Sequence, residues 1–166
     1  MTAADLIRRL GLTPHPREGG YFVETYRSAD QVEVAGRRRS ASTCIYYLLT
    51  PTTFSALHRL VHDEVFHFYA GDPVEMLQLG PDGQGRTIVI GSNLLAGHQP
   101  QVVVPHGVWQ GARLQPGGQF ALLGCTVAPG FDYADYEHGE RQSLIAQFPA
   151  WADAIVRLTQ EPEGPT

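Results

Sequence analysis

A chain of 166 residues with 43% hydrophobic and 17% charged residues is long enough for one domain with a buried core. Seventeen acidic and twelve basic residues give a formal net charge of -5, and every basic residue is an arginine. This balance argues against a nucleic-acid-binding surface. No apolar run approaches the roughly 20 residues of a membrane span, so we expect neither a membrane anchor nor a signal peptide.

Two cysteines, Cys44 and Cys125, lie in apolar runs without the C-x-x-C spacing of a metal or redox site. This pattern favours neither a disulfide framework nor a structural zinc site. We therefore expect a reduced, cytoplasmic protein.

The first elements are a helix and a strand. Thr2 can cap a short helix, apolar residues at helical spacing give it one face, and Gly11 can end it. Residues 21–27 alternate like a strand, whereas Arg37–Arg39 are expected to form a solvated loop.

From residue 42 onward, strand-like runs alternate with turns. Residues 81–85 and 115–118 have the composition of hairpin connections. Such a succession of short strands predicts an all-β sandwich or barrel. The expected strands are residues 43–49, 55–60, 64–69, 74–79, 87–90, 102–104 and 119–127.

The composition changes near the C-terminus. Residues 140–148 and 150–158 carry apolar residues at helical spacing, and Pro149 separates the two runs. Because the sequence has neither an internal repeat nor a linker, we expect a single domain over residues 1–166. Its barrel spans about 18–128 and its C-terminal helices about 140–158.

One segment in the middle of the chain carries the clearest chemical pattern. His58, Glu64 and Gly71 have the spacing of the first cupin motif, G-x5-H-x-H-x(3,4)-E-x6-G, with Leu60 at its second histidine. A later stretch, Pro-His-Gly-Val-Trp-Gln, resembles the second motif, P-x-G-x-x-H, and ends on Gln110 in place of histidine.

The chain therefore resembles the cupin superfamily, and within it the Cupin-5 family of small single-domain cupins. The resemblance implies a double-stranded β-helix, or jelly-roll barrel, with a pocket between its sheets. Cupins commonly protect their exposed edge strands by dimerising, so we expect a homodimer. The blocks that carry the resemblance are residues 18–28, 63–73, 104–110 and 127–137.

Strand alternation predicts which side chains share the pocket. An inward Glu64 brings Phe66 and Phe68 to the same face. His58 and Gln110 then complete an apolar pocket that holds one imidazole, one carboxylate and one amide. We assign chemistry to His58 and Glu64, and ligand contacts to Gln110, Phe66 and Phe68.

A buried Glu64 needs a partner, and unpaired burial would raise its pKa. Arg59, Arg113 and His58 are the candidates. A structural ion pair is the alternative to a functional role.

Metal-dependent cupins normally present three histidines and one glutamate. Here Leu60 and Gln110 occupy two of the histidine positions, so we expect no metal and no other cofactor. A metal enzyme stays an alternative, because histidines away from the motif positions could substitute. These histidines are His62, His67, His98 and His106.

A more distant resemblance is to the dTDP-4-dehydrorhamnose 3,5-epimerases, which are metal-free cupins. Residues 20–24, Gly-Tyr-Phe-Val-Glu, resemble their Gly-aromatic-Phe-x-Glu strand, and Leu57-His58 resembles the segment with their base. The resemblance implies that His58 removes a proton beside a sugar ketone, that a tyrosine is the acid, and that Glu24 and Tyr46 contact the ligand. The candidate acids are Tyr46, Tyr69, Tyr133 and Tyr136.

Two further segments have simpler interpretations. Glu18-Gly19-Gly20 predicts a turn with positive φ, and Glu24 and Arg27 a cross-strand pair; a ligand role is the alternative for these residues. Residues 131–137 are acidic and aromatic, and are expected to form a loop over the barrel mouth, with a calcium or sugar contact as the alternative.

The leading hypothesis is a cupin that binds a small polar organic ligand, such as a carbohydrate, and acts as a metal-independent epimerase or isomerase. The sequence lacks lysine and any counterpart of the epimerases' phosphate-binding residues, which argues against a nucleotide sugar. A non-catalytic binding or storage-type module is the second hypothesis, and a metal-dependent enzyme is the third.

Overall fold

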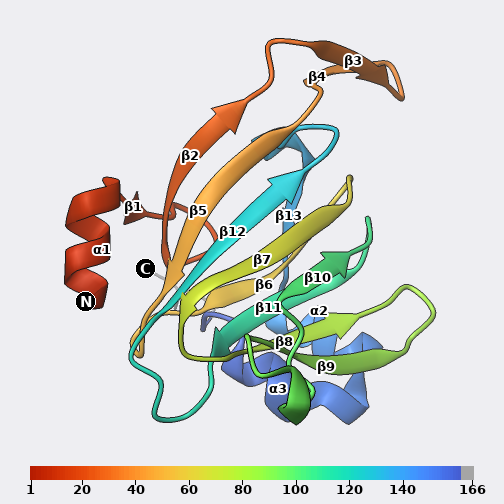
Figure 1. The fold of residues 1–166 in the computed structure, drawn as a ribbon. Coiled ribbons are helices and arrows are strands. Elements are labelled where there is room, and N and C mark those ends of the chain that lie inside the picture. Colours follow the sequence, from red (N-terminus) through yellow and green to blue (C-terminus); the bar gives the residue numbers. More distant parts are fainter. Residues whose placement is uncertain (162–166) are drawn as a thin grey trace, which may run out of the picture.

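The computed structural model describes residues 1–161 as two facing antiparallel β-sheets with helices on their outer surfaces (Figure 1). The all-β class is thereby confirmed. The six-stranded sheet contains, in spatial order, β1 (Thr13–Pro14), β2 (Tyr21–Arg27), β5 (Thr43–Leu49), β12 (Ala121–Val127), β7 (Glu64–Gly71) and β10 (Gln101–Val104). The five-stranded sheet contains β13 (Tyr136–His138), β6 (Ser55–Leu60), β11 (Trp109–Leu114), β8 (Val74–Leu79) and β9 (Gly85–Ile90).

The turns between strands differ in one respect from the sequence expectation. Residues 81–85 join β8 to β9, which pair as the expected hairpin. The hairpin expected at residues 115–118 was wrong, because this turn joins β11 to β12 and those strands belong to different sheets. The composition of a turn predicts that the chain reverses direction, but it does not predict which sheet contains the next strand.

The loop expected at Arg37–Arg39 was also wrong. β3 (Gln31–Val34) and β4 (Arg37–Ser40) form a two-stranded arm that projects beyond the sandwich (Figure 1). Arg37 and Arg39 share one face of β4, and their guanidinium groups lie 3.2 Å and 2.7 Å from the buried carboxylate of Asp135. Asp135, which is distant in the sequence, thus pairs with two arginines of β4 and holds this charged segment against the sandwich.

The N-terminal helix α1 (Ala3–Leu10) has the expected limits, with a capping box at Thr2 and a left-handed Gly11 at its end. Leu6 packs with Leu48 on the outer face of the six-stranded sheet. Helix α1 therefore covers the side of that sheet that faces away from the other sheet.

The C-terminal helices cover the five-stranded sheet. α2 (Arg141–Gln147) is capped by Glu140 and α3 (Ala152–Arg157) follows it, as the helical spacing predicted. Their buried residues pack against Leu57 and Leu77 of the sheet. Three 3-10 turns complete the described structure: η1 (Leu94–Ala96), η2 (Tyr133–Asp135) and η3 (Pro149–Trp151). Among the helices of residues 1–161, none has the length and apolar character needed to span a membrane.

The main core fills the space between the sheets. Tyr47, Phe66, Met76 and Leu123 are almost fully buried there. Toward one end of the sandwich the same inner faces carry polar side chains, and a cavity opens in place of the core.

Candidate functional site

The cavity has a volume of about 370 Å³ and lies between the two sheets. This volume falls within the range of roughly 300–1,000 Å³ that is usual for small-molecule sites. The walls come from five strands, and two non-strand segments close the mouth. The lining residues are His15, Glu18, Phe22, Glu24, Arg27, Thr43, Ile45, His58, Leu60, Glu64, Cys125, Val127, Phe131, Asp132 and Tyr133.

His58 is held in one orientation. Its Nδ1 lies 2.7 Å from the carbonyl oxygen of Ala56, and a carbonyl can only accept, so Nδ1 carries the hydrogen. In the neutral form of the ring, Nε2 is therefore a bare acceptor. That atom is 3.7 Å from Oε2 of Glu18, and the ring of Tyr136 stacks on the imidazole at 5.1 Å.

Glu18 is positioned by the two glycines that follow it. Gly19 and Gly20 have φ values of 92° and 71°, as the sequence predicted, and a side chain on Gly19 would collide with the carbonyl of Phe54. The close approach brings Glu18 against β6, where its backbone oxygen accepts from the N–H of Ala56 at 2.8 Å. Ser55 then donates from Oγ to Oε1 of Glu18 at 2.6 Å.

His15 faces the same carboxylate with the opposite tautomer. Its Nδ1 accepts the backbone N–H of Glu18 at 2.9 Å and is 3.3 Å from the N of Arg17, so the hydrogen belongs on Nε2. Nε2 is 3.7 Å from Oε2 of Glu18. Burial lowers the pKa of His15, which keeps this ring neutral.

Glu18 therefore lies between two imidazoles that present different groups to its carboxylate. His15 presents an N–H, whereas neutral His58 presents a lone pair. Because Nε2 of a neutral His58 and Oε2 of Glu18 both present lone pairs, the space between them suits a ligand group that donates a hydrogen bond, such as a hydroxyl. This pair can hold or pass on a proton inside the cavity.

Glu64 is 7% exposed and starts β7 at the inner end of the cavity. Burial, followed by the nearby charge of Glu18, raises the pKa of Glu64 to about 7. The partners expected among the arginines were wrong, since Arg59 binds Glu137 at 2.7 Å. Instead, Nε2 of Gln110 donates to Oε2 of Glu64 at 2.6 Å.

Gln110 lies behind Glu64 and does not line the cavity. It is 1% exposed, and within residues 1–161 its Oε1 has no hydrogen-bond partner. Cross-strand registration with His58 places the amide between the two groups to which we assigned chemistry. From this position Gln110 can hold Glu64 in place, whereas it does not reach a ligand in the cavity directly.

Glu24 and Arg27 both line the cavity, but the expected cross-strand pair was wrong. They lie on one strand, β2, where Nη2 of Arg27 is 2.8 Å from Oε2 of Glu24. On a regular strand, residues three apart lie on opposite faces. A bulge between Glu24 and Tyr26 shifts the alternation by one residue. The bulge brings the carboxylate and the guanidinium to the same inner face.

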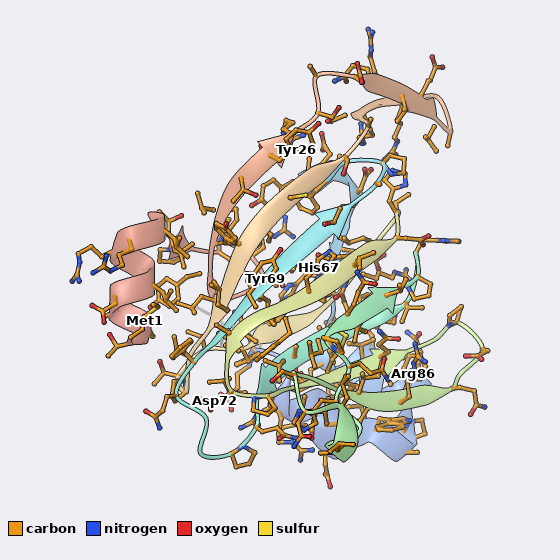
Figure 2. The ribbon with its side chains drawn as sticks, viewed as in Figure 1. Met1, Tyr26, His67, Tyr69, Asp72 and Arg86 are labelled. Carbon is orange, nitrogen blue, oxygen red and sulfur yellow. The ribbon has the colours of Figure 1, made fainter. Side chains whose placement is uncertain are left out.

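Phe66, Phe68 and Tyr46 are not among the cavity-lining residues. Phe66 belongs to the main core and Phe68 packs against it. Tyr46 is on the outer face of β5, where its ring meets that of Tyr69 at 6.0 Å. The same outer face carries His67 (Figure 2).

The segment after β12 folds over the cavity mouth. The guanidinium of Arg27 donates to the carbonyl of Phe131 at 3.3 Å, and the N–H of Phe131 donates to Oγ1 of Thr43 at 2.9 Å. Of the four tyrosines considered as acids, Tyr133 lines the cavity. Tyr136 stacks on His58 from the side.

The residues at the cupin motif positions do not fit a metal ion. Leu60 has no donor atom, and Gln110 offers a neutral amide oxygen where the motif has an imidazole, the group that binds first-row metals tightly. His15 has no free lone pair to offer, because its Nδ1 accepts a backbone N–H. Within residues 1–161, no group of three or more His, Cys, Asp or Glu side chains is arranged to hold a metal.

The predicted site residues did not include His15 or Glu18. Both precede the first long strand, and their approach to His58 depends on a non-local contact with β6. The usable signal was the Gly-Gly pair after Glu18, since glycines with positive φ permit close backbone approach.

Comparison with known proteins gives consistent matches. Residues 4–139 match the family model Cupin_5, described as "Cupin superfamily (DUF985)". The uncharacterized protein YML079W of Saccharomyces cerevisiae is 35% identical over 135 residues, which covers 72% of this chain and 67% of that protein.

Two solved structures are similar over nearly their whole length. A hypothetical protein from Leishmania major has a TM-score of 0.91 and 36% identity, covering 97% of this chain and 100% of that one. Protein SO0799 from Shewanella oneidensis has a TM-score of 0.90 and 33% identity, covering 98% and 99%.

More distant structures share the fold alone. A dTDP sugar isomerase from Desulfovibrio desulfuricans has a TM-score of 0.52 and 12% identity, covering 72% of this chain and 83% of that one. Oxalate decarboxylase from Bacillus subtilis has a TM-score of 0.55 and 14% identity, covering 90% and 38%. The jelly-roll expectation is thus confirmed, and the chain belongs to the Cupin_5 family of the cupin superfamily.

Proposed function

We propose that the protein binds a small polar organic molecule in its cavity and transfers a proton on it, with His58 as the base. One observation carries the proposal. The bond from Nδ1 of His58 to the carbonyl of Ala56 leaves Nε2 as a bare acceptor in the cavity. A positioned acceptor of this kind suits removal of a proton beside a carbonyl.

Glu18 and Glu64 support the two directions of proton transfer. The carboxylate of Glu18, 3.7 Å from Nε2 of His58, stabilises the imidazolium that forms when His58 takes a proton. Glu64, with a pKa of about 7, is partly protonated near neutral pH and can supply a proton.

Isomerisation or epimerisation is the reaction class that needs only such groups. The fold is shared with a dTDP sugar isomerase, which supports the compatibility of the barrel with this chemistry. Because the residues at the metal positions do not fit a metal, we assign no step to one.

Solvent-deuterium exchange tests the proposal. Protein prepared without a polyhistidine tag is incubated in D₂O with free ketoses and 2-keto acids, and the protons beside each carbonyl are followed by NMR. We expect enzyme-dependent loss of one such proton signal. If a compound binds saturably and shows no exchange above the rate without protein, the proton-transfer role is wrong and the cavity serves binding.

We also propose that the protein works as a homodimer in the cytoplasm. The outer face of the six-stranded sheet exposes Tyr26 and Tyr69, which are 54% and 53% accessible (Figure 2). Cys44 and Cys125 are free thiols, as suits a reducing compartment. Light scattering at micromolar concentration should give twice the chain mass of 18.2 kDa, whereas a mass of one chain contradicts the dimer.

A further inference from the structure

The cavity is rich in acidic groups. Four carboxyl side chains line it, from Glu18, Glu24, Glu64 and Asp132, against the single guanidinium of Arg27. The electrostatic environment of a ligand in the cavity is therefore predominantly negative.

The one arginine is already neutralised. Nε and Nη2 of Arg27 donate to the two carboxylate oxygens of Glu24 at 2.9 Å and 2.8 Å, and both terminal nitrogens lie 3.3 Å from the carbonyl of Phe131. This bidentate geometry is the one that an anionic ligand would need. An anion would have to displace Glu24 and leave that carboxylate unpaired.

The two histidines do not supply a replacement. His15 is kept neutral by burial and by the backbone N–H that its Nδ1 accepts. A proton on His58 would face Oε2 of Glu18 at 3.7 Å, so its charge is balanced. No cationic group of the lining is left over for a phosphate or a carboxylate.

The remaining features of the lining suit hydroxyl groups and apolar ring faces. Carboxylate oxygens accept hydrogen bonds from hydroxyls, and the lining has four such groups. Phe22, Phe131 and Tyr133 add aromatic surface, with the rings of Phe131 and Tyr133 meeting edge to face at 5.0 Å. A volume of about 370 Å³ suits a compact ligand better than a nucleotide-linked one.

We infer that the cavity selects an uncharged, polyhydroxylated molecule of monosaccharide size and excludes its phosphorylated or nucleotide-linked forms. Glu24 is the residue that sets this selectivity, because it occupies the bidentate face of Arg27. This inference rests on the proposed function and specifies its ligand class.

Matched sugar pairs test the inference. Wild-type protein is titrated with free hexoses and ketohexoses, with the 6-phosphate of each, and with dTDP, and binding is followed by saturation-transfer NMR at constant ionic strength. We expect at least one free sugar to bind saturably, and its 6-phosphate and dTDP to bind at least tenfold more weakly.

Two variants make the test specific to Glu24. Glu24→Gln should free the guanidinium of Arg27. The ratio of the affinities for the free sugar and for its 6-phosphate should then fall at least threefold. Glu33→Gln removes an exposed acidic residue of β3 that lies outside the cavity. It changes the net charge by the same amount and should leave the ratio of the two affinities unchanged.

The outcomes separate the inference from the proposed function. A 6-phosphate that binds as tightly as its free sugar overturns the charge selection, while proton exchange on that ligand would leave the proposed function standing. If no sugar of either kind binds, the inference is wrong. Exchange on the 2-keto acids then decides the proposed function independently.

Discussion

The two ends of the sandwich are made from the same strands but differ in chemistry. On β5, Thr43 and Ile45 line the cavity, whereas Tyr47 and Leu49 belong to the main core. All four residues are on the inner face, because they alternate along one strand. The packed end stabilises the fold, and the open end places polar groups at its rim.

The transition between the two ends takes only one step along a strand. On β7, Glu64 lines the cavity while Phe66, two residues later, is fully within the core. Two residues correspond to about 6–7 Å along a strand. Strand alternation therefore reports the face of a side chain, and the depth at which the cavity ends is set by packing.

The largest stability effect is expected at the packed end. Leu123→Ala removes a fully buried side chain from the main core and should lower the free energy of unfolding by about 2–5 kcal/mol. Ligand affinity should stay within about twofold, because Leu123 does not line the cavity. Urea denaturation and ligand titration measure the two effects, and a large loss of affinity at full folding would mean that the ends are coupled.

Glu64→Gln should show the opposite behaviour at the open end. Because the folded pKa of Glu64 is about 7 and its ordinary value is 4.5, the wild type loses stability as pH rises from 4.5 through 7. The variant has no such loss, so it should gain up to about 3 kcal/mol over wild type by pH 8 and nothing below pH 4.5.

Binding or turnover should fall in the same variant, since the amide keeps the volume and removes the titrating group. Denaturation at pH 4, 6 and 8 checks the sign. A Glu64→Gln protein that is less stable at pH 8, with unchanged ligand binding, would show that Glu64 is a structural ion-pair partner.

A smaller effect is expected where the β3–β4 arm meets the open end. Asp135 is 5% exposed, and hydrogen bonding from Arg39 lowers its pKa. Asp135→Asn should cost about 1–3 kcal/mol, because it removes a charge-assisted bond at 2.7 Å. It should also weaken ligand binding by releasing the mouth segment that carries Tyr133. Unchanged affinity in a measurably destabilised variant would limit Asp135 to a structural role.

Local patterns predicted most of the fold. Four strands, at residues 21–27, 43–49, 55–60 and 74–79, have the bounds that the sequence predicted, because apolar alternation and flanking turns are local signals. The motif spacing likewise indicated His58 and Glu64, which both line the cavity.

Two missed features depend on contacts between distant segments. Glu18 reaches His58 through a backbone bond to β6, and the β4 arginines become ordered through Asp135. Tyr46 lies on the outer face because its neighbour Ile45 faces inward, and the sequence of that strand alone does not say which of its two faces is the inner one. Such information is absent from any single segment.

The most direct test of the central claim compares wild type with His58→Asn in solvent-deuterium exchange and in ligand binding. Asparagine can still donate to the carbonyl of Ala56, but it cannot take a proton at neutral pH. We predict that exchange falls by about 10²- to 10⁴-fold while the variant folds and binds with similar affinity. Retention of most of the exchange rate would contradict the account and remove His58 from proton transfer.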